Sequence, residues 1–217
     1  MEYRHYEALA ALFVYPDEGF PDHLERIQGI LEDAYPEAAD RLTPFIDGAR
    51  RMSRQEAEEL FTRSFEVQAL TTLDVGYVLF GDDYKRGSLL VNLNREHREA
   101  GNDCGGELAD HLPNVLRLLP QLADDEVRDD LVEHILVPAL VKIVGEFEPD
   151  VIERKEKVYV KHHRTKIERS EEYGTLYRHP LTAVLLVLTH DFDVEVDDLP
   201  DASKAFLKNI AAEMELA

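Results

Sequence analysis

Apolar residues recur at helical spacing along most of this chain, and few segments alternate as β-strands do. Near the N-terminus, for example, Tyr6, Leu9 and Phe13 fall three or four residues apart, which places them on one face of a helix. Apolar residues make up 44% of the 217 residues, enough to build a core for one domain. We therefore predict an all-α fold, a single helical-bundle domain of about eight to ten helices over residues 1–217.

Local signals predict where several of these helices begin and end. Ser53 and Glu56 have the spacing of a capping box, in which each side chain accepts the backbone N–H of the other residue. Gly81 and Gly101 are typical helix stops, and Pro138 predicts a kink in a long amphipathic segment. The predicted helical segments are 6–14, 21–34, 36–52, 53–65, 70–80, 84–100, 110–122, 124–147, 173–190 and 201–216.

The charge pattern narrows the possible partners. A net charge of −21 makes nucleic acid and anionic membranes poor partners, and it favours a basic partner or simply solubility. The segment 153–169 is different, with seven Lys or Arg against three Asp or Glu. A solvated basic face is the simpler interpretation, and binding of RNA or another acidic partner is the alternative. Its adjacent His162 and His163 would point about 100° apart on a helix and make a poor chelate.

The cysteine count and the hydropathy predict a cytoplasmic protein. The only cysteine, Cys104, permits neither a disulfide within the chain nor a cysteine-based zinc site. The N-terminal residues mix acidic, basic and apolar side chains and do not read as a signal peptide. The most apolar run, 183–188, is far too short to span a bilayer.

The stretch GELADHLPNVL, residues 106–116, raises the question of a metal or acid–base site. A chelate on one helix would need Glu107, Asp110 and His111 on a shared face. Pro113 opposes this, because a proline inside a helix clashes with the carbonyl four residues back, at a cost of about 3 kcal/mol. If Asp110 is the N-cap instead, the proline falls in the first turn, where it is tolerated. We therefore expect the helix to begin at Asp110 and Glu107 to lie in the preceding loop.

Several stretches then line up in one order along the chain. They are LFVYP (12–16), LFTRSFEVQALTTLDVGYVLFG (60–81), GDDYKRGSLLVNLNREHREAG (81–101) and ELADHLPNVLRLL (107–119). Their order and spacing resemble the NarJ branch of the TorD-like chaperones, which are cytoplasmic proteins dedicated to assembling molybdenum oxidoreductases. The resemblance covers roughly residues 9–122, and the ELxDHLP motif is its most specific part. The matching residues are Phe65, Glu66, Gly81, Arg86, Gly87, Glu107, Leu108, Asp110, His111, Leu112 and Pro113.

The chain departs from the pattern of this family at two places. Ala109 stands where the family's motif carries a proline, which loosens this loop. Tyr84 and Lys85 stand in the GxxxxRG turn, where many members carry a second acid and an arginine. The second departure indicates a client other than classical nitrate reductase.

The resemblance implies an all-helical, non-catalytic protein without a cofactor of its own. Its partner would be the apo catalytic subunit of a nitrate or dimethyl sulfoxide reductase-like enzyme, bound through an N-terminal, twin-arginine-like peptide. The chaperone would hold this peptide until the molybdenum cofactor is inserted, before maturation or export. Molybdenum cofactor biosynthesis proteins are further possible partners.

A binder of such a peptide should offer an apolar groove with an acidic rim. We predict that the groove is formed by Phe61, Phe65, Tyr77, Phe80, Asp82, Arg86, Glu107, Asp110, His111 and Pro113. Within this set we expect Arg86 to pair with an acid and fix the turn, and His111 to donate a hydrogen bond at the groove edge. The alternative is a helical-bundle metalloenzyme that uses Glu107, Asp110 and His111 with a distant ligand such as His134 or His179.

Overall fold

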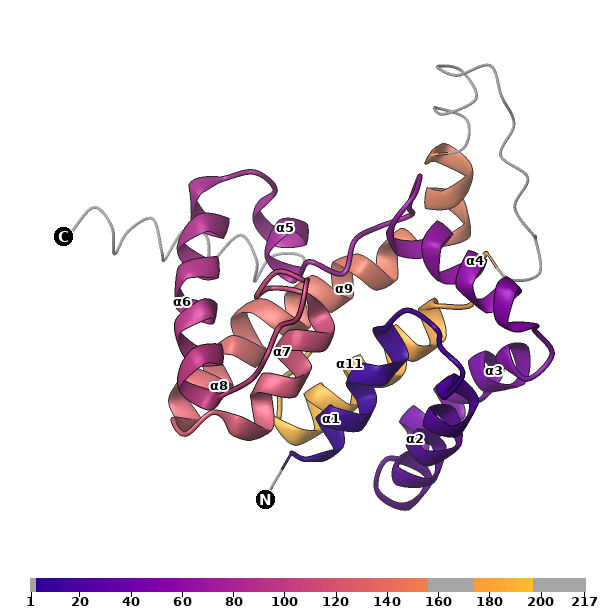
Figure 1. The fold of residues 1–217 in the computed structure, drawn as a ribbon, viewed down its shortest axis with the longest axis horizontal. Coiled ribbons are helices and arrows are strands. Elements are labelled where there is room, and N and C mark those ends of the chain that lie inside the picture. Colours follow the sequence, from indigo (N-terminus) through magenta and orange to yellow (C-terminus); the bar gives the residue numbers. More distant parts are fainter. Residues whose placement is uncertain (1–2, 156–173, 197–217) are drawn as a thin grey trace.

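The computed structural model describes residues 3–155 and 174–196, and this part contains ten α-helices and no β-strand (Figure 1). The predicted all-α fold is therefore confirmed. The helices are α1 (His5–Leu9), α2 (Phe20–Ala34), α3 (Pro36–Ala49), α4 (Arg54–Phe65), α5 (Val75–Phe80), α6 (Tyr84–Ala100), α7 (Leu112–Leu118), α8 (Asp125–Leu131), α9 (Val137–Glu146) and α11 (Arg178–Asp191). The predicted helix 201–216 and most of the basic segment 153–169, including His162 and His163, lie outside the described residues.

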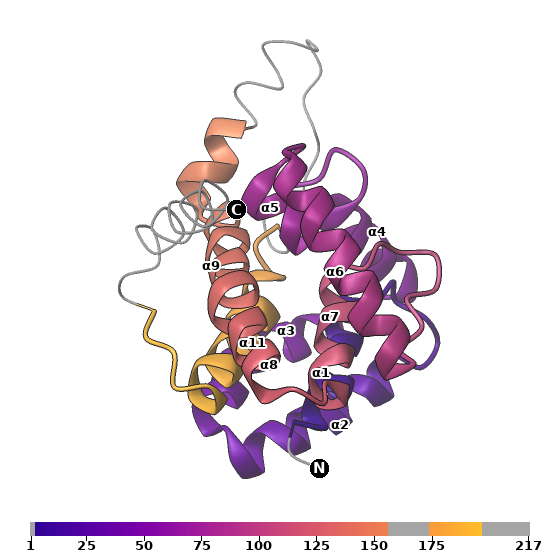
Figure 2. The same ribbon diagram turned by 90° about the vertical axis from the view of Figure 1, so that its left-hand side faces the viewer.

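Helix α11 forms the centre of the core because it is apolar on most of its surface. Its buried side chains pack against α3 on one side and α9 on the other. Helix α2 covers α3, while α5 packs on both α6 and α9 (Figures 1 and 2). Among the described residues no helix is long and apolar enough to cross a membrane.

The predicted helix ends on either side of the site region agree with the structure. Ser53 Oγ accepts the Glu56 N–H at 3.3 Å, and the Glu56 carboxylate accepts the Ser53 N–H at 2.7 Å, so the capping box forms. Helix α6 runs from Tyr84 to Ala100 as predicted. Gly101 ends it with φ +68°, a left-handed conformation that glycine adopts without steric cost.

The long predicted segment 124–147 is divided by a π-helical turn, η3 (Val132–Leu136), between α8 and α9. Pro138 follows this turn as the second residue of α9. A proline has no N–H, and its ring clashes with the carbonyl four residues back, which here belongs to His134. The wider turn removes this conflict, so the predicted irregularity at Pro138 takes the form of a π-bulge.

The prediction that Asp110 caps α7 is wrong by one residue. The N-cap is His111, whose carbonyl accepts the N–H groups of Asn114 and Val115, and Pro113 is the second helical residue. Asp110 cannot cap the helix because its carboxylate binds Arg86 and its carbonyl accepts a hydrogen bond from Val75. The proline lies in the first turn, as expected.

A buried carboxylate ties the first helices to the end of α11. Asp191 accepts hydrogen bonds from Tyr35 Oη at 2.7 Å, His5 Nε2 at 2.8 Å and Tyr6 Oη at 2.9 Å. Burial alone would raise the pKa of Asp191, but the hydrogen bonds and the neighbouring His5 together lower it. Because these contacts join residues far apart in the chain, they fix where α11 ends.

Candidate functional site

The ELADHLP segment is held against the start of α5 by two backbone hydrogen bonds. Val75 N–H donates to the Asp110 carbonyl, and Leu112 N–H donates to the Leu73 carbonyl, both at 2.9 Å. These bonds form an isolated antiparallel bridge between Asp74 and His111. The motif therefore lies beside α5 and α6, the helices that enclose the GxxxxRG turn.

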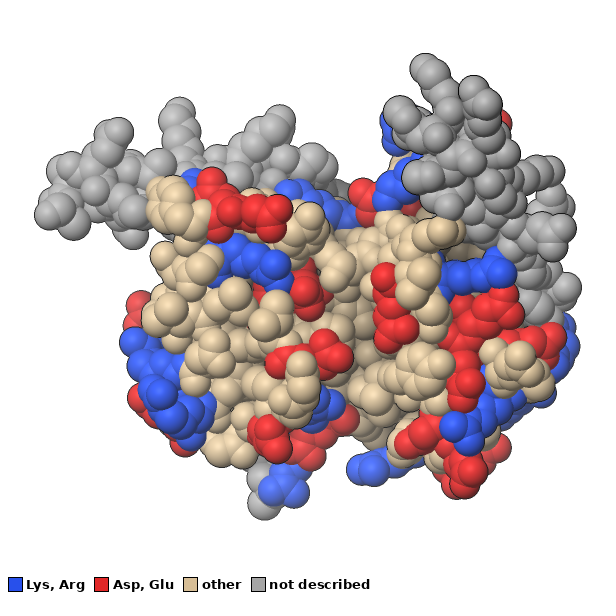
Figure 3. Space-filling model, turned by 45° about the horizontal axis from the view of Figure 1, so that its top comes forward, with Lys and Arg blue, Asp and Glu red and all other residues tan. Residues whose placement is uncertain are grey.

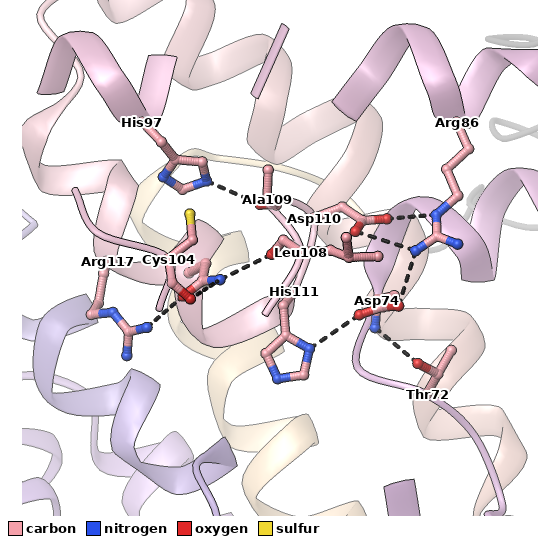
Figure 4. Close-up of polar contacts among 11 residues, drawn as sticks. Thr72, Asp74, Arg86, His97, Cys104, Leu108, Ala109, Asp110, His111 and Arg117 are labelled. Atoms are coloured by element: carbon pink, nitrogen blue, oxygen red, sulfur yellow. Dashed lines mark hydrogen bonds and ion pairs between the residues drawn. The ribbon is translucent and has the colours of Figure 1, made fainter. Parts of the chain in front are cut away.

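Arg86 of α6 connects the two segments of this bridge (Figure 4). Its Nε donates to Asp110 Oδ2 at 2.9 Å, and its Nη2 donates to Asp74 Oδ2 at 2.9 Å. The Asp110 side chain is fully buried, so its charge depends on this partner for compensation. Burial disfavours the Arg86 cation, but the hydrogen bonds and charges of the two aspartates raise its pKa overall. The prediction that Arg86 pairs with an acid is confirmed.

Gly76 makes the close approach of Asp110 possible. A Cβ built at this position would lie 2.7 Å from Asp110 Oδ2 and 2.9 Å from a methyl carbon of Leu89. Contacts this short essentially never occur for a real Cβ. The first turn of α5 therefore needs a residue without a side chain, because the buried ion pair fills the space.

His111 contacts the network through Asp74. Its Nδ1 lies 3.1 Å from Asp74 Oδ1, and the imidazole is mostly buried. The hydrogen bond from His111 is the largest influence that holds the pKa of Asp74 below its ordinary value, and Arg86 adds to it. As expected, His111 makes a hydrogen bond, but its partner is a side chain of this protein.

The loop between α6 and α7 is fixed from the other side by buried polar groups (Figure 4). Because a carbonyl can only accept, His97 Nε2 donates to the Ala109 carbonyl at 3.0 Å, leaving Nδ1 to accept from Asn102 at 2.9 Å. Burial lowers the pKa of His97 and so favours the neutral form of the ring. Asn114 donates to the Leu108 and Cys104 carbonyls at 2.9 and 3.3 Å. These contacts hold the loop in place from the α6 and α7 sides.

A separate groove of about 430 Å³ lies between α6 and the α8–η3 segment. We call it the α6–α8 groove. Figure 2 shows α6 and α8 from the side on which both helices lie toward the viewer. The surface of the groove is mainly apolar, as in most ligand pockets. The apolar lining consists of Phe80, Leu89, Leu93, Val127, Leu131 and Ile135, and the polar lining consists of Tyr84, Lys85, Ser88, Asn92, Arg95, Glu96, Asp130 and His134.

One wall of this groove is α8, a helix rich in acidic residues, of which Asp130 lines the groove; the other charged lining residues are Lys85, Arg95 and Glu96 from α6. Six exposed Asp or Glu residues lie between residues 124 and 133. The one basic residue among them, Arg128, is buried and donates to the Leu119 carbonyl at 2.9 Å, so it offers little charge to the surface. Lys85 lies at the groove position next to the start of α6. On the face that Figure 3 shows, acidic and basic side chains are both interspersed with uncharged ones.

The structure does not bring the ten predicted peptide-binding residues into one groove. Phe61 and Phe65 are buried in α4, where the Phe65 ring lies 4.8 Å from the ring of Tyr177, so core packing covers them. Phe80 alone among the ten lines the α6–α8 groove. Tyr77 is 42% exposed, and its ring lies 5.1 Å from the Arg86 guanidinium.

The other predicted residues divide between the ion-pair network and the surface. Arg86, Asp110 and His111 belong to the network, and Pro113 is buried in the first turn of α7. Asp82 and Glu107 are exposed and lie outside the helices.

The carboxylates and the imidazole of the ELADH segment do not converge on one point. Asp110 turns to Arg86, His111 turns to Asp74, and Glu107 is exposed in the loop. In residues 3–155 and 174–196, no group of three or more His, Cys, Asp or Glu side chains is arranged to hold a metal ion. His134 lies beside Asp130 on the groove rim, and His179 is in the first turn of α11.

Sequence reasoning missed the groove because it depends on how two helices are spaced. Leu89 and Leu93 have the four-residue spacing typical of a core-facing stripe, yet both border the groove, and Leu89 is partly exposed. The one sequence signal near the groove was the acidic run 124–133. So many acids on one short helix indicate a helix whose exposed side is negatively charged.

Comparisons with known proteins leave the family resemblance as a prediction. No protein-family model matches the chain, and no curated protein sequence matches it either.

Proposed function

We propose that this protein is a cytoplasmic chaperone that binds the N-terminal peptide of a molybdenum oxidoreductase catalytic subunit in the α6–α8 groove. The observation that carries the proposal is an apolar groove bordered by α8, because six exposed acids lie at 124–133 and one of them, Asp130, lines the groove. Such a surface suits a peptide with basic residues followed by an apolar or amphipathic stretch, which is the pattern of a twin-arginine-like segment. The ELxDHLP and GxxxxRG motifs support the choice of this client class over other basic peptides.

The apolar and the acidic side chains at the groove would contribute to peptide binding in different ways. Apolar groove residues such as Leu89 and Val127 gain by covering an apolar helix face. Exposed acids such as Asp130 attract the arginines and speed the encounter, an effect that weakens with salt. The ion-pair network of Arg86 with Asp74 and Asp110 fixes the start of α6, which forms one wall of the groove. The bound peptide would then be held while the molybdenum cofactor, delivered by its biosynthesis proteins, enters the client.

A groove-filling substitution tests the proposal. Isothermal titration would use a synthetic peptide with two arginines followed by an apolar stretch, added to the full chain. Ser88→Trp places a large ring in the groove and should weaken binding by at least about tenfold. Val91→Trp is the matched control, because Val91 is on the same helix, is 71% exposed and lies outside the groove lining. Equal weakening by both variants, or no binding to the parent chain, would refute the proposal.

A charge variant tests the acidic residues of α8 separately. Asp130→Lys should weaken the arginine-containing peptide and leave a peptide with both arginines changed to glutamine unaffected. The difference between the two peptides should shrink as ionic strength rises. Equal affinity for both peptides at low salt would show that the acids play no part.

The metalloenzyme alternative has no specific observation in its favour. Its three central side chains already have separate partners or face solvent, as described above.

A further inference from the structure

The four charged residues that line the α6–α8 groove differ in whether a partner within the chain compensates their charge. Arg95 and Glu96 form an ion pair at 2.9 Å, so together they present little net charge. Asp130 lies 3.8 Å from the imidazole of His134, the long limit for an ion pair, and its side chain is 68% exposed. Lys85 makes no side-chain hydrogen bond or ion pair within the part of the chain that the structure describes. The groove therefore presents one uncompensated cation and one weakly paired acid.

Lys85 is the second residue of α6, at the end of the groove where α5 packs on η3. Its backbone N–H donates to Asp83 Oδ1 at 2.9 Å, so this carboxylate serves as the cap of the helix. The lysine is partly buried, and Leu89 follows one turn later on the same face of α6. Coulomb attraction is stronger beside apolar side chains than in open water, because they hold water away. A carboxylate would therefore bind the Lys85 ammonium group more tightly here than at a fully exposed site.

Lys85 and Asp130 lie on opposite walls of the groove, in α6 and α8 respectively. Helix α6 runs away from α5, whereas α8 leads through η3 back to the place where α5 packs (Figures 1 and 2). A helical peptide between the two walls would have α6 along one flank of its apolar stripe and α8 along the other. The Arg95–Glu96 pair begins ten residues after Lys85. This separation is roughly 15 Å along α6, beyond the screening length of about 8 Å at physiological salt, so the pair has little influence on a charge bound at Lys85.

We propose that Lys85 binds a carboxylate of the client peptide and so determines which peptides the groove accepts. The preferred peptide is an amphipathic helix whose apolar stripe has arginine on the flank that faces α8 and Asp or Glu on the flank that faces α6. An arginine placed next to Lys85 is repelled, so the same residue selects against peptides that are basic on both flanks. This inference rests on the proposed function and deepens it, because it assigns a specificity-determining residue to the same groove.

Three substitutions separate the charge of Lys85 from its apolar stem, since long lysine stems also cover apolar surface. Lys85→Met keeps most of the stem and removes the charge, whereas Lys85→Arg keeps the charge. Arg98→Met is the control for net charge, because Arg98 is on the same helix, is exposed and lies outside the groove lining. The Lys85 side chain has no partner in the described chain to lose. Lys85→Met should therefore unfold within about 2 °C of the parent chain.

Isothermal titration of paired peptides into the full chain measures the preference for a carboxylate. Each synthetic peptide has two arginines and an apolar stretch, and it is acetylated and amidated so that only its side chains supply carboxylates. One glutamate is placed in turn at each position that flanks the apolar stripe, and glutamine at the same position is the reference. At one or more positions glutamate should bind the parent chain roughly three- to tenfold more tightly than glutamine. Lys85→Met should abolish this preference, whereas Lys85→Arg and Arg98→Met should retain it.

A charge exchange tests whether the two groups contact each other directly. Lys85→Glu should reverse the preference, so that a peptide with lysine at the selected position binds this variant more tightly than the peptide with glutamate. Carbodiimide coupling, which joins an ammonium group and a carboxylate in contact as an amide, should link the peptide glutamate to Lys85 in the parent chain. Peptide mass mapping identifies the coupled lysine. Coupling only to lysines outside the groove overturns the contact.

The outcomes distinguish this inference from the proposed function. Equal affinity for glutamate and glutamine at every position, in a chain whose peptide binding Ser88→Trp still weakens, overturns the role of Lys85 and leaves the proposed function intact. A glutamate preference that survives in Lys85→Met also overturns it, because the carboxylate then has another partner. If none of the peptides binds the parent chain, the proposed function is refuted and this inference is refuted with it.

Discussion

Replacing Arg86 by methionine should destabilise the fold more than any exposed charge substitution. Methionine keeps most of the apolar stem of Arg86 but removes the guanidinium that donates to Asp110 and Asp74. The Asp110 carboxylate would remain fully buried without its cation. Removing one partner of a buried ion pair typically costs about 3–5 kcal/mol, because the remaining charge is stranded in a medium of low polarity.

The size of the effect can be read in thermal unfolding. For a chain of this length, a loss of 1 kcal/mol lowers the melting temperature by roughly 2–4 °C, so Arg86→Met should lower it by roughly 6–20 °C. Arg95→Met is the control, because Arg95 is on the same helix but half exposed, and its pair with Glu96 should contribute less than about 1 kcal/mol. Urea denaturation would give the free energy of unfolding independently.

A second substitution checks the proposed cause. Adding Asp110→Asn to Arg86→Met removes the stranded charge and should recover most of the lost stability. The reasoning is refuted if Arg86→Met unfolds within about 1 kcal/mol of the parent protein, or if the double variant is less stable than the single one.

Two further predictions concern stability. Gly76→Ala should lower the free energy of unfolding, measured by urea denaturation, by about 1–3 kcal/mol, because its Cβ would lie 2.7 Å from a buried carboxylate oxygen. Gly29→Ala in α2, where a Cβ would have open space, should instead raise it by about 0.5–1 kcal/mol. A stabilising effect of Gly76→Ala would contradict the geometry. The pKa values of Asp74 and Asp191 are lowered in the folded protein, so the stability these groups contribute is present above the ordinary aspartate pKa and is lost as pH falls through the lower folded values. The midpoint urea concentration of unfolding should therefore decrease as the pH is lowered below about 4. Asp191→Asn should reduce this dependence of the urea midpoint on pH.

The groove and the network illustrate how tertiary contacts redirect residues that look functional in the sequence. Glu107, Asp110 and His111 lie within five positions of the chain, yet each has a different environment in the structure. The partners of the last two, Arg86 and Asp74, lie 24 and 37 residues away in sequence. Short-range spacing cannot show such pairings, since they depend on the backbone bridge between 73–75 and 110–112.

The sequence alone determined the helical class of this protein and many of its helix ends. Helical periodicity, the Ser53–Glu56 capping box and Gly101 act within a few residues, so local physics is sufficient to predict them. The tertiary structure decided which side chains are available for function. In the folded protein Phe61 and Phe65 are buried in the core, Asp110 forms an ion pair with Arg86, and the α6–α8 groove lies between two packed helices. Those outcomes depend on how distant helices pack, because burial and pairing are properties of neighbours in space and not of neighbours in the chain.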